Sequence, residues 1–391
     1  MKYRWLVLFV FMLNGMSTQM LWITFAPIAR DVAAIYTGGD TDKIDLLALV
    51  FMLLYIPVSF PASWCIDKFG LKKGTGIGVV MVGIFGFLRA FSPDFTWLLI
   101  FQVGCAIGQP FVLNSFTKVA ANWFSEKEAA IANGLATVSM LLGLIIAMFS
   151  TGPIVSYYKA MGNDKTGIDV ILLIFGIYSL VAMFLYLILV KDKPAIPANA
   201  HGDEVKLNMT RGLKALFRNR DFIYLLLIFF IGLGAFNAIT AKVDVIFNRP
   251  LSIMSDVTTG LMGGLIIAGG VFGAGILAAL SDKYRKRKLF IVLILILAIP
   301  LTLMLAYTFN YILLCFVCFF FGFFLVAALP IGLTYATEKT HPVPEATSNG
   351  MLMLAGQISG IVFVLGFNML ALAALFAVGL LLSLKLREIE D

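Results

Sequence analysis

The stretch QMLWITFAPIA, residues 19–29, places an amide and an indole on one face of an apolar helix, because Gln19 and Trp22 are three residues apart. The next charged residues are Arg30 and Asp31, so Trp22 lies about eight residues, or roughly 12 Å, from them along the helix. A tryptophan that anchors a helix at a membrane surface needs no such depth. An indole face attracts organic cations, so the pair predicts one wall of a ligand-binding cavity.

Other amides and hydroxyls also lie inside apolar stretches, where a polar side chain is costly and usually faces the interior of a helix bundle. They are Asn14, Gln102, Gln109, Asn114, Asn133, Thr137, Asn237, Thr240, Asn349 and Gln357. Taken singly, each amide suits a helix–helix contact as well as a substrate contact. Their concentration in a few helices predicts that several of them line one cavity.

The carboxylates that adjoin the apolar stretches fall near helix ends or in loops. They are Asp45, Asp67, Asp244, Asp256, Asp282 and Glu338. Proton-driven carriers usually need an intramembrane carboxylate to bind the proton, so this pattern favours facilitated diffusion. The sequence contains no G-x-x-x-x-G-K-[ST] phosphate-binding motif, which argues against ATP as the energy source. We expect no catalytic residues, no metal and no cofactor, and therefore not an enzyme.

The composition indicates the environment of the chain. Of its 391 residues, 61% are hydrophobic and 13% are charged, whereas a soluble domain has about 25% charged residues. We predict an all-α integral membrane protein, because a spanning helix needs about 20 apolar residues and twelve stretches qualify. These are 4–29, 45–66, 75–92, 96–121, 129–153, 168–190, 221–245, 255–280, 289–308, 311–337, 346–367 and 368–384.

The net charge of +7 is explained by the positive-inside rule rather than by nucleic-acid binding, which we do not expect. With the N-terminus in the cytoplasm, most of the 29 Lys and Arg residues fall on the cytoplasmic side. The seven exceptions are Arg30, Lys43, Arg89, Lys159, Lys165, Lys242 and Arg249. We predict a multi-pass protein of the cell (plasma or inner) membrane with both termini in the cytoplasm.

The twelve stretches form two groups of six. Residues 1–190 and 221–391 are predicted to be six-helix bundles, and residues 191–220 are a polar linker. The first part of the linker is rich in Pro and Ala and reads as flexible. Residues 205–217 space leucines among lysines and arginines, which suits either a basic amphipathic helix on the inner membrane surface or a solvated tether.

A charged loop is repeated in the two halves. Asp67, Lys68 and Lys72 stand in PASWCIDKFGLKKG, and Asp282 and Lys283 stand in LAALSDKYRKRK. An acid is unfavourable at a helix C-terminus, so each Asp needs a basic partner. We predict that these residues, together with Glu338, form gating ion pairs. Ordinary stop-transfer charge is the alternative.

The D-x-x-G-x-[RK]-[RK] pattern of the first loop resembles the signature of major facilitator transporters, and the second loop lacks its glycine. RWLVLF, DLLALVFMLLYIPVSFPASWCID, GQPFVLNSFTKVAANWF and PIGLTYATEKTHPVPEATSNGMLMLAGQISGI resemble the feline leukaemia virus subgroup C receptor-related family. The resemblance covers most of the chain. It implies the major facilitator fold, a central cavity between two halves, and transport of choline and ethanolamine, with haem export also proposed for the family.

The resemblance also implies substrate contacts. The family's cage tryptophan falls on Trp22, its cavity glutamines on Gln109 and Gln357, and its contacts from the second helix on Phe51 and Met52. Its second cage aromatic, a tyrosine, is replaced here by Asn237. We therefore expect a primary amine or another polar metabolite rather than a quaternary amine.

The sequence thus predicts a secondary transporter that moves a small polar or cationic metabolite, such as choline or ethanolamine, by alternating access and facilitative uniport. We expect a monomer with the substrate and the lipid bilayer as its partners. A proton- or sodium-coupled carrier of another solute, with Asp45 or Glu338 as the coupling acid, is one alternative. A haem transporter or receptor is another, with only His201 and His341 available as imidazole ligands.

Overall fold

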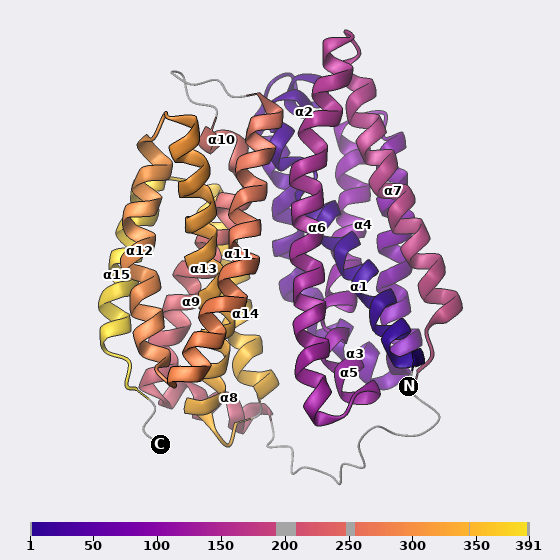
Figure 1. Cartoon of the computed structure of the whole chain (residues 1–391). Coiled ribbons are helices and arrows are strands. Elements are labelled where there is room, and N and C mark those ends of the chain that lie inside the picture. Colours follow the sequence, from indigo (N-terminus) through magenta and orange to yellow (C-terminus); the bar gives the residue numbers. More distant parts are fainter. Residues whose placement is uncertain (1, 193–208, 248–254, 344, 389–391) are drawn as a thin grey trace. The chain divides into compact units, whose positions relative to one another are not determined.

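The computed structural model describes residues 2–192, 209–247, 255–343 and 345–388 of the chain. All regular structure in these ranges is helical, as predicted (Figure 1). The chain divides into two compact units. The first comprises residues 1–202 and 253–261, and the second comprises residues 203–252 and 262–391.

The first unit is built mainly from seven helices within the described ranges. They are α1 (Lys2–Ile23), α2 (Ala29–Tyr36), α3 (Thr41–Leu88), α4 (Phe95–Leu113), α5 (Ser115–Trp123), α6 (Glu126–Ala160) and α7 (Asp164–Leu189). Short 3-10 turns, η1 (Ala26–Ile28) and η2 (Arg89–Phe91), follow α1 and α3.

The second unit contains α8 (Met209–Arg218), α9 (Arg220–Ala241), α10 (Val243–Phe247), α12 (Arg287–Tyr307), α13 (Tyr311–Thr340), α14 (Glu345–Leu365) and α15 (Met369–Leu384). It also contains α11 (Asp256–Tyr284) from Met262 onward.

The described residues include ten helical stretches that are long and apolar enough to cross a membrane, and α15 is a shorter apolar helix. One of the ten, Thr41–Phe91, contains two of the predicted spans. Its helix α3 is interrupted at Gly70, where φ is 83° and ψ is 172°. Only glycine adopts such a conformation without strain. Counting two spans in this stretch, and α15 as one, accounts for the twelve predicted spans.

The first predicted span, 4–29, is not one continuous helix, and this corrects the expected location of Trp22. α1 ends at Ile23, and η1 and α2 follow. Pro27 explains the break: it has no N–H to donate to the carbonyl of Ile23, four residues earlier, and it disfavours helical geometry at the preceding residue. Trp22 therefore stands at the end of α1, beside a break, instead of in the middle of a helix.

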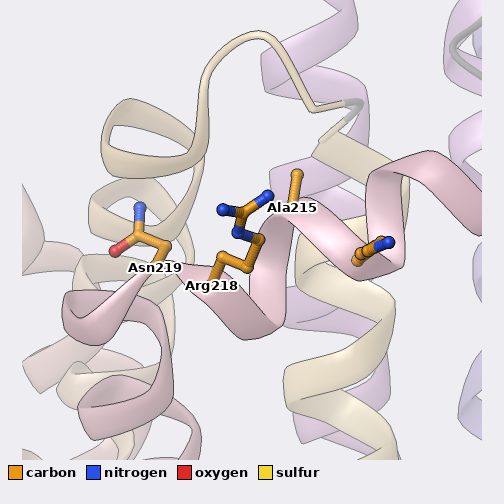
Figure 2. Close-up of a pocket in the computed structure, with 4 residues that line it drawn as sticks. Ala215, Arg218 and Asn219 are labelled. Atoms are coloured by element: carbon orange, nitrogen blue, oxygen red, sulfur yellow. The ribbon is translucent and has the colours of Figure 1, made fainter.

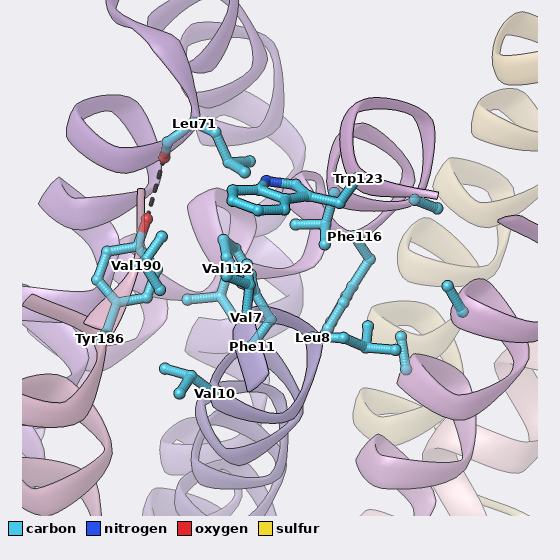
Figure 3. Packing of buried hydrophobic residues seen from close by; sticks show 14 of the residues in the cluster. Val7, Leu8, Val10, Phe11, Leu71, Val112, Phe116, Trp123, Tyr186 and Val190 are labelled. Atoms are coloured by element: carbon cyan, nitrogen blue, oxygen red, sulfur yellow. Dashed lines mark hydrogen bonds between the residues drawn. The ribbon is translucent and has the colours of Figure 1, made fainter. Parts of the chain in front are cut away.

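The apolar core of the first unit lies between α1 and its neighbours. Figure 3 shows Phe11 of α1 among side chains from α4, α5 and α7, including Phe116, Trp123 and Tyr186. The Tyr186 hydroxyl donates to the carbonyl of Leu71 at 3.0 Å, which fastens α7 to the second part of α3.

An ion pair fastens the beginning of α1 to the beginning of α6. Arg4 and Glu128 approach to 2.5 Å. The hydroxyl of Ser125 also donates to Glu128, at 2.8 Å. The hydrogen bond from Ser125, together with the charge of Arg4, holds the pKa of Glu128 below its usual value. The ionised carboxylate of Glu128 therefore helps to hold the beginning of α1 against α6.

In the second unit, α11 and α13 approach so closely that their contact requires glycine. A β-carbon on Gly269 or Gly273 would overlap the backbone carbonyls of Phe319 or Phe323 in α13. Small residues at helix contacts are the usual means of association in membranes, because they allow backbones to approach.

α8 precedes α9 in the second unit, within the segment where an amphipathic helix or a tether was expected. Leu216 of α8 is fully buried, whereas Lys214 and Arg218 are exposed. These two cations line a surface pocket with Ala215 and Asn219 (Figure 2). The remainder of the predicted linker, residues 193–208, lies outside the described residues.

Candidate functional site

Trp22 is buried where α1 meets α3. Its indole nitrogen donates to the carbonyl of Ala48 at 3.2 Å, and this bond holds the ring by its polar edge. Ala48 stands one helical turn before Met52, and both Phe51 and Met52 are buried. Three predicted site residues of the first unit, Trp22, Phe51 and Met52, therefore belong to one region.

Three buried or half-buried amides of the first unit hold helices together. Asn14 of α1 donates to the carbonyl of Ala182 in α7 at 3.2 Å. Asn114, which follows α4, donates to the carbonyl of Ser59 in α3 at 3.0 Å. Gln102 donates to two backbone carbonyls and accepts from Arg89.

Gln19 and Gln109 differ from these three. Both residues are more than nine-tenths buried, yet neither forms a hydrogen bond with the part of the chain that the structure describes. The amide groups of both residues keep some contact with solvent. Both residues remain predicted ligand contacts.

In the second unit, Asn237 of α9 lies against α14. Its amide nitrogen donates weakly to the carbonyl of Gly356, at 3.4 Å. The next residue is Gln357, which is half-buried and has no hydrogen-bond partner among the described residues. The two predicted site residues of this unit are thus neighbours.

The predicted gating residues of the first unit have specific partners. Asp67 pairs with Lys118 of α5 at 2.7 Å, so its partner comes from another helix and not from its own loop. The ammonium of Lys68 lies 4.5 Å from the centroid of the Trp64 ring. The backbone N–H of Lys72 donates to Asp192, which follows α7, at 2.6 Å.

Two of the predicted gating residues of the second unit, both acids, pair with an arginine that the sequence did not single out. Arg287 pairs with Asp282 and, at 3.2 Å, with Glu338 of α13. Lys283 instead lies 5.8 Å from the ring of its neighbour Tyr284. The repeated acidic loop is therefore tied to a neighbouring helix in both units, by Lys118 in one and by Arg287 in the other.

Sequence reasoning also missed Arg89, which it counted only among the seven basic residues on the non-cytoplasmic side. Arg89 is fully buried and bonds to α1 and α4. An arginine near the end of a long apolar stretch looks the same in sequence whether it faces water or the bundle interior. Among the described residues, no group of three or more His, Cys, Asp or Glu side chains is arranged to hold a metal ion.

Comparison with known proteins relates this architecture to a family. A model of the Major Facilitator Superfamily matches residues 7–364. Solute carrier family 49 member A3 of Xenopus tropicalis is 31% identical over 389 residues, which cover 94% of this chain and 78% of that protein. The choline/ethanolamine transporter FLVCR2 of Rattus norvegicus is 29% identical over 381 residues, with 93% and 68% covered.

Solved structures share the fold at lower identity. A bacterial homologue of the human lysosomal transporter Spinster aligns with a TM-score of 0.78 and 16% identity, covering 98% of this chain and 95% of that one. A D-xylose–proton symporter aligns with a TM-score of 0.75 and 12% identity, covering 100% and 99%. These likenesses confirm the predicted fold. The chain is therefore a multi-pass membrane transporter and not an enzyme, and it belongs to the Major Facilitator Superfamily, in the branch of the feline leukaemia virus subgroup C receptor-related and solute carrier 49 proteins.

Proposed function

We propose that this protein carries a small amine, such as ethanolamine or choline, across the cell membrane by facilitative uniport with alternating access. The observation that carries the proposal is the division of the buried amides. Asn14, Gln102 and Asn114 are bonded to the protein, whereas Gln19 and Gln109 have no partner in the described chain. Buried polar groups are normally satisfied, so amides left open inside a transporter suit a polar ligand.

The aromatic groups favour an amine. Trp22 supplies an indole, and a desolvated cation on an indole face gains about 2 kcal/mol or more. The relatives named choline/ethanolamine transporters support this substrate class. Asn237 stands where the family has a second aromatic. Its amide oxygen can accept a hydrogen bond from a primary amine, whereas a quaternary amine has no N–H to donate. We therefore place ethanolamine ahead of choline.

The ion pairs at the ends of the helices would control access. Asp67 with Lys118, and Arg287 with Asp282 and Glu338, fasten loops to neighbouring helices within each unit. In this proposal they hold one conformation of the transport cycle and part in another. Both termini lie in the cytoplasm, in keeping with the charge bias of the sequence.

The test is uptake into proteoliposomes that contain the purified protein. Labelled ethanolamine and choline should equilibrate down their own gradients, and preloading with unlabelled amine should accelerate labelled uptake. Trp22→Ala should lower the apparent affinity, whereas Trp97→Ala, a matched change at a tryptophan that is 48% exposed on α4, should not.

Two results would contradict the proposal. Absence of uptake and of saturable binding for both amines would remove the substrate class. Accumulation above equilibrium when a proton or sodium gradient is imposed would replace uniport with the ion-coupled alternative.

A further inference from the structure

Arg89 is a charged side chain with no exposed surface, located in η2 directly after α3. Within the part of the chain that the structure describes, no carboxylate oxygen lies close enough to the Arg89 guanidinium to form an ion pair. The guanidinium instead donates to the carbonyl of Leu21 at 2.9 Å and to the amide oxygen of Gln102 at 2.7 Å. It also contacts the hydroxyl of Thr24 at 3.4 Å. Burying a charge without an opposite charge is expensive, so Arg89 must serve a purpose at this position that an apolar residue would not.

The acceptors lie at the break in the first span. α1 ends at Ile23, and the last four carbonyls of a helix have no partners within the helix. Leu21 contributes one of these carbonyls, and it accepts from both Arg89 and Gln102. The ring of Phe25, just past the break, lies 5.5 Å from the guanidinium carbon of Arg89. Arg89 therefore contacts both sides of the break.

The same network reaches α3 through Gln102. Its amide oxygen accepts from Arg89, which orients the amide nitrogen toward the carbonyl of Leu47 at 2.9 Å. The next carbonyl along α3, that of Ala48, accepts the indole N–H of Trp22. Trp22 is thus linked on one side to Leu21, its neighbour in α1, and on the other to Ala48. Arg89 and Gln102 both donate to the carbonyl of Leu21, next to Trp22, and Gln102 also donates to the carbonyl of Leu47, next to Ala48.

We propose that Arg89 is a positioning residue. Its planar guanidinium, acting with Gln102, fixes the interrupted end of α1 against α3 and thereby sets the orientation of Trp22. Arginine suits this task because it offers several donors in a rigid plane, whereas lysine offers a single ammonium on a flexible chain. The effect on substrate rests on the proposed function, but the effect on the break does not.

Hydrogen exchange of the purified protein measures the break without any substrate. In Arg89→Gln and in Gln102→Leu, backbone amides of residues 21–26 and 28 should exchange about tenfold faster or more, because a buried charge-assisted hydrogen bond is lost. Arg89→Lys should accelerate exchange in the same segment. The control is Tyr186→Phe, which removes a buried hydrogen bond to Leu71 elsewhere in the unit and should leave residues 21–28 unchanged.

Transport supplies a second measurement. Gln102→Leu, which keeps the guanidinium, should raise the KM for the amine about tenfold with a smaller change in kcat, as expected for a displaced binding residue. The positioning role is overturned if exchange in residues 21–28 stays at the wild-type rate in Arg89→Gln and Gln102→Leu. It is also overturned if Arg89→Lys behaves as wild type, since charge alone would then suffice. If an Arg89 variant does not fold, Gln102→Leu decides. If the wild-type protein moves no amine, the proposed function fails, and the exchange data still judge the role of Arg89.

Discussion

Trp22 is the residue on which the amine proposal depends most. Its indole N–H is bonded to Ala48, so its ring is held in one orientation before substrate arrives. We predict that Trp22→Ala weakens amine binding by about 2 kcal/mol, near thirtyfold, and that Trp22→Phe retains part of the affinity. Calorimetric titration of the purified variants checks both values, with melting temperature and yield recorded alongside. Normal affinity in Trp22→Ala, combined with a lower melting temperature, would show that the ring only packs.

Asn237 tests which amine the protein prefers. Its weak bond to the carbonyl of Gly356 leaves it beside Gln357. We predict that Asn237→Tyr, which restores the aromatic of the family, improves binding of choline relative to ethanolamine by several-fold, because a quaternary amine gains an aromatic face. Asn237→Leu is the control for bulk without that face. An unchanged preference in Asn237→Tyr would argue against an aromatic contact at this position.

At the scale of elements, the pair between Asp67 and Lys118 joins the kink of α3 to α5. The side chain of Asp67 is 77% exposed, so the pair itself contributes little stability, about 0–1 kcal/mol. We propose instead that the pair favours one conformation of the transport cycle. We predict that Asp67→Asn and Lys118→Gln each slow transport several-fold with little loss of binding, and that the double variant is no slower than either single one.

The matched control for this pair is Lys43→Gln. It removes a similarly exposed ion pair with Asp40, at 3.3 Å, and should leave transport intact. Cysteine-accessibility measurements on both sides of the membrane report any shift in conformation. Transport and accessibility that remain at wild-type levels in Asp67→Asn would rule out a gating role.

The contact between α11 and α13 makes a prediction about stability. Gly273→Ala would force the backbones apart, because a β-carbon there overlaps the carbonyl of Phe323. We expect a loss of about 1–3 kcal/mol, as for other overpacked contacts. Gly275→Ala, on the same helix with open space around it, should change the melting temperature little. Equal melting temperatures for the two variants would contradict the close contact.

At the scale of the whole molecule, the positive-inside bias predicts the orientation of the chain. Single cysteines at Lys43 and at Lys73 should lie on opposite sides of the membrane. We predict that a membrane-impermeant maleimide labels Lys43→Cys in intact cells and labels Lys73→Cys only after permeabilisation. Labelling in the reverse order would invert the proposed topology.

The sequence by itself determined the features that depend on local composition. The apolar stretches predicted the spans, because a bilayer tolerates few charges over the length of a helix. The superfamily and the branch followed from motifs such as the loop around Asp67 and the stretch around Gln357, and comparison with known proteins confirmed both. The positions of Gln109 and Asn237 along their helices were also readable, because polar residues are rare in such stretches.

Only the tertiary structure decided which polar side chain meets which partner. Gln102 and Gln109 occupy one face of the same helix, yet Gln102 is bonded to Arg89 and to two carbonyls, while Gln109 is open. The cation that pairs with Asp67 is Lys118, which is 51 residues away in sequence. Arg89 was counted only as a basic residue of the non-cytoplasmic side, yet it is fully buried. Helical periodicity fixes the direction of a side chain on its own helix, but a hydrogen bond or ion pair depends on the neighbouring helix, and packing alone brings that helix into place.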